Sequence, residues 1–166
     1  TGTHLGLPPA QIALIEAAAA AGKPVVVVIV AGSAILTEGW REKAGAILQT
    51  FYCGQEGGTA LARLLFGAVS PSGKRPVPGA RDPADDPFYD KDADAITYDL
   101  WHGYTKLERE GIAPRYAFGH GLSYARFGYR ALSVRKSGDQ LQVSVAITNE
   151  GSVAAEEVGF FFVAPP

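Results

Sequence analysis

The sequence predicts an α/β fold: part of an open α/β sandwich, with a mostly parallel sheet flanked by helices, followed by an incomplete antiparallel β-sandwich. Val25–Val30 is a run of six β-branched residues without polar alternation, which is typical of a strand covered on both faces by helices. Leu141–Thr148 alternates apolar with polar residues, which indicates one strand of an antiparallel sheet. This change of pattern predicts two domains, at residues 1–124 and 125–166.

Composition limits the classes of partner. The chain has 166 residues, of which 47% are hydrophobic and 19% charged, and its net charge is −2. It is therefore able to bury a core and is not disordered by composition. No run of Lys and Arg is present, which argues against nucleic acid as a partner, because such binding needs clustered cations. The longest apolar run, residues 24–36, is too short to span a membrane, so no membrane partner is expected. Compartment and oligomeric state stay open.

The first part of the chain predicts a helix, two strands and a second helix. Pro8 and Pro9 fit the entry of a helix, and Gly22 fits its end. The strand Val25–Val30 follows, and a second apolar strand precedes a glycine-rich corner at Gly54–Gly58. This order predicts adjacent parallel strands whose carboxyl ends meet at one edge, which is where ligands of open α/β sheets collect.

The glycine-rich corner has no nucleotide-binding motif, since it matches neither the dinucleotide fingerprint nor the P-loop. Glu56 stands just ahead of the second helix, where its charge suits the positive end of the helix dipole; a contact with substrate is the alternative. Cys53 is the only cysteine, so no internal disulfide is possible, and a small buried hydrophobe is expected there. The helix at residues 57–66 is expected to end at Gly67 in the left-handed conformation. The strand before the corner is expected to contain Ile47, Leu48, Phe51 and Tyr52.

A proline-rich stretch at residues 70–90 predicts a long surface loop. Ile96–Tyr104 then gathers aromatic side chains, among them Tyr98 and Trp101. These rings are able to stack on the face of a sugar, or to pin the long loop to the domain, and both interpretations stay open. The three histidines are too widely spaced, and too poorly supported by Cys or acidic neighbours, to suggest a metal site.

Two expectations concern the C-terminal part of the chain. Phe118 and Leu122 are expected to be buried against the α/β core, where they would anchor the return of the long loop. A further strand is expected at Val158–Val163. Three strands cannot close a sandwich core, so the second domain is expected to be cut off.

Several motifs follow one another in an order that resembles a known family. They are Leu5–Pro8, Lys23–Val30 with Gly32-Ser33, Ala46–Leu48 with Gly54–Gly58, Leu65–Gly67, Pro71–Lys74, Gly103-Tyr104 and Phe118–Tyr124. Together they resemble the C-terminal part of glycoside hydrolase family 3, the β-glucosidase and β-xylosidase family. Val143–Asn149, with Gly151 after it, resembles the start of the fibronectin-III-like domain that many members carry. The chain departs from the family at Cys53, where Pro is usual, and at residues 75–79.

The resemblance implies part of a retaining, exo-acting β-glycosidase, above all a β-glucosidase that hydrolyses terminal β-D-glucosyl residues. It implies a barrel domain that carries the nucleophilic Asp, and an acid/base Glu that falls before Thr1. Neither catalytic carboxylate is then in this chain, which is expected to be inactive alone. No cofactor is implied, since acid/base chemistry between carboxylates needs none. The implied partner is a β-glucoside or oligosaccharide bound through the barrel, with Glu56, Tyr98 and Trp101 as candidate substrate-binding residues.

A function of another class is a non-catalytic carbohydrate-binding or interaction module, with Tyr98, Trp101 and Tyr104 as its platform. Extending the reading frame upstream separates the two hypotheses, because a barrel with an aspartate motif would establish the enzyme. Glucoside versus xyloside specificity and linkage preference stay open.

Overall fold

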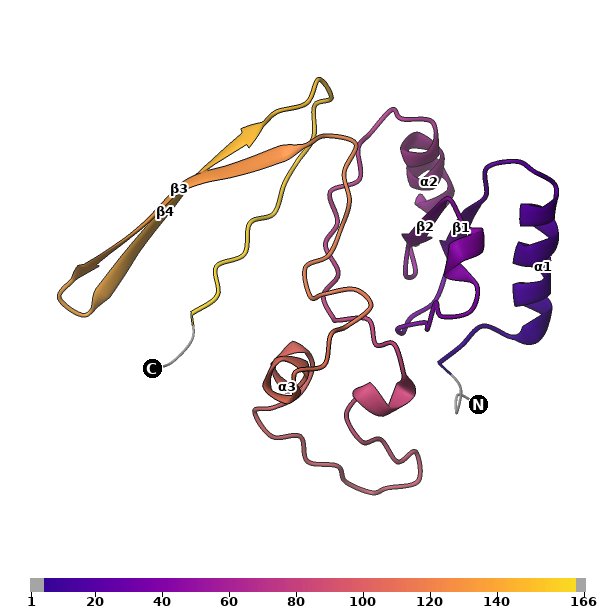
Figure 1. Cartoon of the computed structure of the whole chain (residues 1–166), viewed down its shortest axis with the longest axis horizontal. Coiled ribbons are helices and arrows are strands. Elements are labelled where there is room, and N and C mark those ends of the chain that lie inside the picture. The colour runs from indigo at the N-terminus through magenta and orange to yellow at the C-terminus, as the bar shows by residue number, and fades with distance from the viewer. Residues whose placement is uncertain (1–4, 164–166) are drawn as a thin grey trace. The chain divides into compact units, whose positions relative to one another are not determined.

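The fold divides into two compact units, seen in a computed structural model that describes residues 5–163. The first unit comprises the chain up to Gly57 together with Arg75–His120, and the second comprises Gly58–Lys74 together with the chain from Gly121 onward. Among the described residues, no helix is both long and apolar enough to cross a membrane. The α-helices and strands of both units are labelled in Figure 1.

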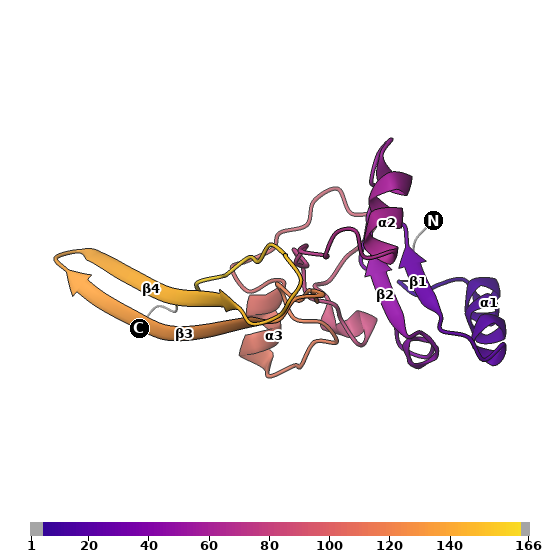
Figure 2. The ribbon, with the colours of Figure 1, turned by 90° about the horizontal axis from the view of Figure 1, so that it is seen from above.

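A two-stranded parallel sheet forms the centre of the first unit. Helix α1 (Pro9–Ala20) leads to strand β1 (Val26–Ile29), and a short 3₁₀ helix η1 (Arg41–Lys43) precedes strand β2 (Ala46–Gln49). The strands pair in parallel, from Val26 opposite Ala46 to Ile29 opposite Gln49. Helix α1 lies beside β1 in both views (Figures 1 and 2). The prediction of adjacent parallel strands is confirmed.

The core of this unit joins one residue of α1, one of β1 and one of the segment before η1. Ile15, Ile29 and Trp40 are buried and pack as one cluster, and Trp40 is only 1% exposed. The indole of Trp40 is also satisfied, because its Nε1–H donates to the Leu36 carbonyl at 3.2 Å. A large aromatic side chain with a paired N–H is a strong anchor for a small core.

The expectation that Val25–Val30 is covered on both faces is wrong for this chain. Val26 is 45% and Val30 65% exposed, whereas Ile29 is buried. Successive side chains of a strand point to opposite faces, and the Ile15–Ile29–Trp40 cluster occupies only one of them. An unbroken β-branched run therefore identified the strand correctly but not the number of layers on it.

The remainder of the first unit is the proline-rich loop and its return. The loop contains the 3₁₀ helix η2 (Pro83–Asp85), and helix α3 (Tyr104–Glu110) follows it. The return is pinned at Gly79, whose N–H donates to the Tyr116 carbonyl at 2.7 Å. The Tyr116 hydroxyl also lies 3.2 Å from the Thr37 hydroxyl. The predicted loop is thus held by backbone and side-chain bonds rather than by helix or sheet.

In its described part, up to residue 163, the second unit contains one helix and one hairpin. Helix α2 begins at the junction of the units and spans Gly57–Leu65, and Gly67 (φ +74°) closes it by donating to the Leu64 carbonyl, as predicted. Strands β3 (Phe127–Ser137) and β4 (Gln140–Asn149) pair antiparallel, with a register shift between Arg130 and Ser133.

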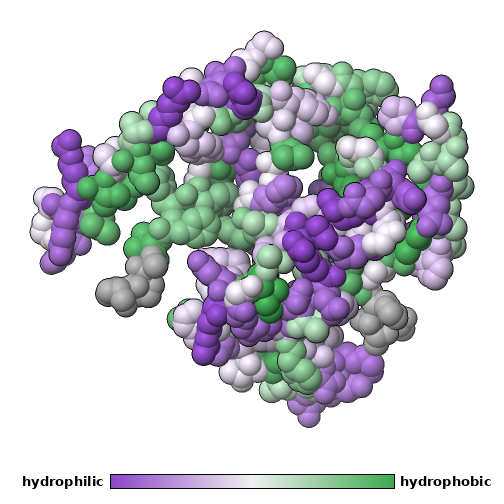
Figure 3. Space-filling model, in the orientation of Figure 1, coloured by the Kyte–Doolittle hydropathy of each residue, from purple (hydrophilic) through white to green (hydrophobic). Residues whose placement is uncertain are grey.

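The hairpin has one polar and one apolar face. Ser133 lies opposite Ser144, with their hydroxyls 2.8 Å apart, and Val134 lies opposite Val143 on the other face. Figure 3 shows apolar surface along this hairpin. The alternation predicted for Leu141–Thr148 is therefore present, although part of the apolar face is exposed.

Two sequence-based expectations about the second unit are wrong. Residues 158–163 form no strand, because no described segment pairs with them in a ladder. Leu122 is 78% exposed rather than buried, and Phe118, in the first unit, is only half-buried. The reason at Leu122 is its neighbour Ser123, whose Oγ turns inward to lie 2.9 Å from the Ser70 Oγ. In an extended segment the adjacent side chain then points outward.

A buried polar cluster holds the second unit together. The Lys74 ammonium donates to the Gly121 carbonyl at 3.0 Å and lies 2.9 Å from Glu157 Oε1, and the Tyr129 hydroxyl donates to the same carboxylate at 2.9 Å. The Lys74 and Glu157 side chains are only 12% and 11% exposed. Burial by itself raises the pKa of Glu157, but the hydrogen bonds from Lys74 and Tyr129 outweigh it, so the pKa is lowered.

This lowered pKa predicts acid sensitivity. A carboxyl group whose pKa is lower in the folded state contributes stability that is present above its unfolded pKa and is lost as pH falls through the folded pKa. For Glu157 the loss begins near the ordinary value of 4.5 and continues below it. We expect the free energy of unfolding, measured by urea titration at several pH values, to fall below this point. In Glu157→Gln the slope should be shallower; an unchanged slope would contradict the assignment.

Candidate functional site

The candidate site is the edge at which β1 and β2 both end. The strands finish level, and the Thr50 N–H continues their pairing by donating to the Ile29 carbonyl at 3.0 Å. The Gln49 side-chain amide donates across to the Ala31 carbonyl at 3.3 Å. The segments that leave the two strands therefore lie side by side, at the carboxyl edge where open α/β sheets place their ligands.

The segment after β2 turns sharply as it leaves the strand. Phe51 has φ +53°, in the left-handed region that bulky residues rarely adopt, and Gly54 has φ +67°. The expectation that Phe51 and Tyr52 belong to β2 is thus wrong, because the left-handed turn ends the ladder at Gln49. Cys53 is also exposed rather than buried, and its thiol donates to the Thr50 carbonyl at 3.2 Å.

Tyr52 lies against the segment after β1. A Cβ atom added to Gly32 would be 2.7 Å from Tyr52 Cε2, so the ring touches the backbone at a place where only glycine leaves room. Even so, the side chain of Tyr52 is 76% exposed. Sequence reasoning missed this residue because aromatic content was taken as evidence for strand. The signal that was available is its place directly before the cysteine–glycine turn.

Glu56, a candidate substrate-binding residue, is exposed in the turn that precedes α2. The sequence placed it correctly ahead of the helix. Within residues 5–163 no hydrogen bond joins its carboxylate to the first N–H groups of α2, so only its position, and no bond, ties it to the positive end of the helix dipole. A carboxylate left free at this edge keeps its acceptor oxygens available for hydroxyl groups.

Tyr98 and Trp101, the other candidate substrate-binding residues, lie on the segment before α3. Tyr98 is 48% exposed, and its hydroxyl donates to the Phe88 carbonyl at 3.1 Å. Trp101 is 44% exposed, and the Arg109 guanidinium lies 4.9 Å from the centre of its ring. Each ring is thus partly occupied in fastening the loop, while a large part of its surface stays open.

These candidates occupy two separate places. Trp101 contacts Arg109 of α3, and α3 lies apart from the β1–β2 sheet in both views (Figures 1 and 2). Among the described residues no ring contact or hydrogen bond joins Glu56 to Tyr98 or Trp101. The structure therefore brings Tyr52 to Gly32 at the edge, whereas no hydrogen bond or ring contact of the described residues joins Glu56 to the aromatic loop.

One ion pair ties the loop return to the segment that follows β1. The Arg115 Nη2 donates to Glu38 Oε2 at 2.8 Å, and Nε donates to the other oxygen. The hydrogen bond from Arg115 is the main reason that the pKa of Glu38 is lowered. Paired in this bidentate way, the Glu38 carboxylate ties these two segments together.

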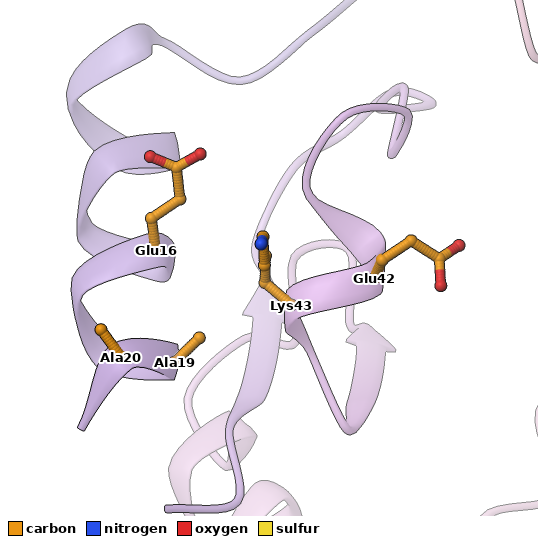
Figure 4. Close-up of a pocket in the computed structure, with 5 residues that line it drawn as sticks. All are labelled: Glu16, Ala19, Ala20, Glu42 and Lys43. Atoms are coloured by element: carbon orange, nitrogen blue, oxygen red, sulfur yellow. The ribbon is translucent and has the colours of Figure 1, made fainter. Parts of the chain in front are cut away.

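The residues described carry no cluster of His, Cys, Asp and Glu that could hold a metal ion. A hollow of about 400 Å³ lies between α1 and η1 and is lined by Glu16, Ala19, Ala20, Glu42 and Lys43. Figure 4 shows Lys43 projecting between α1 and η1, with Glu42 directed away from α1. The hollow is open and has no aromatic wall, so it offers a saccharide little to stack on.

Comparisons with known proteins agree with the fold. The model of the glycosyl hydrolase family 3 C-terminal domain matches residues 2–124. Probable beta-glucosidase J of Aspergillus fumigatus is 35% identical over 98% of this chain and 20% of its own length. An exo-alpha-(1->6)-L-arabinopyranosidase of Bifidobacterium longum is 39% identical over 97% of this chain and 22% of its own.

Solved structures show the same likeness. The structure of beta-glucosidase 3B from Thermotoga neapolitana, in complex with glucose, has a TM-score of 0.83 at 33% identity and covers 91% of this chain and 23% of that one. The chain spans about a fifth of the length of the curated relatives it matches. On the family model and on this shared fold, the chain belongs to the glycosyl hydrolase family 3 C-terminal domain family.

Proposed function

We propose that this chain is part of a retaining, exo-acting β-glycosidase that hydrolyses terminal β-D-glucosyl residues. Residues 1–124 supply its α/β sandwich domain, and residues 125–166 begin a fibronectin-III-like domain. The observation that carries the proposal is the match of the family model to residues 2–124. The β-glucosidase names of several relatives, similar over almost the whole chain, support the substrate class.

In a retaining glycosidase, we expect this chain to contact substrate without supplying the catalytic carboxyl groups. A retaining glycosidase needs two carboxyl groups about 5–5.5 Å apart across the scissile bond. In the family resemblance both lie outside these residues, in a barrel domain and ahead of Thr1. The chain then supplies one wall of the substrate site, with Glu56, Tyr98 and Trp101 as contacts to the sugar. This hydrolysis needs no partner other than a β-glucoside or oligosaccharide, and it needs no cofactor.

A non-catalytic carbohydrate-binding module is the second candidate. It is favoured by the exposed aromatic surface of the loop before α3, where Tyr98 and Trp101 keep 48% and 44% of their surface open. In this case the rings bind saccharide without any catalytic partner.

The test compares the 166-residue chain with the same chain joined to its natural upstream sequence. Nitrophenol release is measured from aryl β-glucosides, aryl β-xylosides and aryl α-L-arabinopyranosides, and product anomers are followed by NMR. We expect retaining hydrolysis by the longer protein. The chain alone should show none, because positioning and paired carboxylate chemistry each supply several orders of magnitude.

Two outcomes would contradict this proposal. Turnover by the 166-residue chain would place the catalytic groups inside it. A longer protein that binds glucan without hydrolysing any of the three glycosides would favour the binding module.

A further inference from the structure

We propose that Tyr52 is a substrate-contacting residue of the glycosidase, whose phenol ring stacks on the pyranose ring of a bound glycoside at the carboxyl edge of β1 and β2. This inference rests on the proposed function and adds a residue to it. It differs from the Tyr98 and Trp101 assignment, because those rings lie on the loop before α3 and not at this edge.

The backbone just before Tyr52 has an unusual, left-handed conformation. Phe51 takes up φ +53°; a left-handed conformation in a bulky residue costs of order 1 kcal/mol or more and persists only where the surrounding structure enforces it. Hydrogen bonds hold the preceding residue in place: Thr50 donates to the Ile29 carbonyl from both its N–H (3.0 Å) and its hydroxyl (3.0 Å). Strained residues of this kind cluster where a side chain must be aimed.

The Tyr52 ring also approaches Gly32 closely. Because a Cβ atom at this position would lie 2.7 Å from Tyr52 Cε2, the glycine makes the space that the ring edge occupies. The backbone after Tyr52 is also closely packed, since a Cβ atom at Gly57 would lie 2.6 Å from the Cβ of Cys53. The ring is thus supported on one side and held in a defined direction.

The Tyr52 ring is largely exposed to solvent. An aromatic ring fastened in this way usually completes a core, yet Tyr52 leaves 76% of its surface open. Close to it in the sequence, Gln55 and Glu56 are polar and exposed, as is Ser33 next to Gly32. A supported, exposed aromatic face suits a pyranose, which presents C–H bonds on its faces, and polar residues close in the sequence suit the hydroxyl groups around its rim.

The test uses the enzyme with its natural upstream sequence and compares Tyr52→Ala with a matched control, Tyr89→Ala. Tyr89 is another tyrosine of the first unit and is 70% exposed. We expect Tyr52→Ala to raise KM for aryl β-glucoside and cellobiose about 5–10-fold, as the loss of one stacking contact implies. The value of kcat should change less than about 2-fold, because a contact made equally in ground and transition states affects KM alone. Tyr89→Ala should leave both constants unchanged.

Two further variants separate stacking from a merely structural role. Tyr52→Phe keeps the ring and should retain KM within about 2-fold, since its hydroxyl is not the contact. Gly32→Ala keeps the tyrosine but forces the ring edge away, so it should raise KM in the same direction as Tyr52→Ala. Thermal unfolding of the two Tyr52 variants, followed by circular dichroism, should stay close to that of the parent, because the Tyr52 side chain is exposed.

The outcomes distinguish this inference from the proposed function. If the parent enzyme hydrolyses glycosides and Tyr52→Ala matches Tyr89→Ala in KM, the inference about Tyr52 is overturned and the function stands. A lowered melting temperature with unchanged KM would likewise overturn it, since the ring would then pack against protein. If the parent enzyme hydrolyses no glycoside, both fail together.

Discussion

Replacing Lys74 by methionine should lower the free energy of unfolding of the chain by about 3–5 kcal/mol, the cost of removing one partner from a buried ion pair. The Glu157 carboxylate would keep the hydrogen bond from Tyr129 but lose its counter-ion, with only 11% of its side chain in contact with solvent. The Gly121 carbonyl would lose its donor as well. Urea unfolding at neutral pH, followed by circular dichroism, measures the effect.

A matched control is available on the surface. Lys91 pairs with Asp92, but these side chains are 63% and 75% exposed, so Lys91→Met should cost less than about 1 kcal/mol. The double variant Lys74→Met/Glu157→Leu should recover much of the loss, because no unpaired charge then stays buried. Equal losses for Lys74→Met and Lys91→Met would show that burial does not set the strength of this pair.

Truncating Trp40 to alanine should cost about 3–5 kcal/mol, since a large buried side chain leaves a cavity that its neighbours refill only in part. Trp40 is 1% exposed and joins Ile15 of α1 to Ile29 of β1, and its Nε1–H bond to Leu36 would also be lost. The measurement is again the urea midpoint and slope. Leu122→Ala is the control, because that side chain is 78% exposed and its removal should change stability by no more than about 0.5 kcal/mol. Comparable losses at both positions would mean that Trp40 is not the centre of the core.

The sequence predicted those parts of the fold that local patterns encode. The β-branched run at residues 25–30 and the glycine-rich corner were enough to predict parallel strands with a shared edge, and Gly67 was enough to predict the end of α2. Periodicity also identified β4. These features depend on neighbours in the chain, which a pattern records directly.

What the sequence did not predict depends on distant residues. Helix α3 went unpredicted because it has only seven residues and follows an aromatic stretch that obscures its period. The left-handed turn at Phe51 removed Tyr52 from the strand, and aromatic content alone could not reveal it. Lys74 and Glu157 are 83 positions apart, so nothing in either segment indicates that they pair.

The candidate site was predicted in part. The edge itself, and the place of Glu56 ahead of α2, followed from strand order. The aromatic loop was identified as a cluster of rings, but only the structure separates it from the edge. The role of each of these side chains toward a sugar stays a prediction.

The exposed thiol of Cys53 allows a spectroscopic probe to be attached at this edge. Cys53 is the only cysteine of the chain and is solvent-exposed, so a maleimide fluorophore or a nitroxide spin label reacts at a single atom without any engineered mutation. That atom belongs to the residue next to Tyr52. If Tyr52 contacts substrate as proposed, the emission or spin mobility of a label there should change when saccharide binds, and every other side chain of these 166 residues stays native.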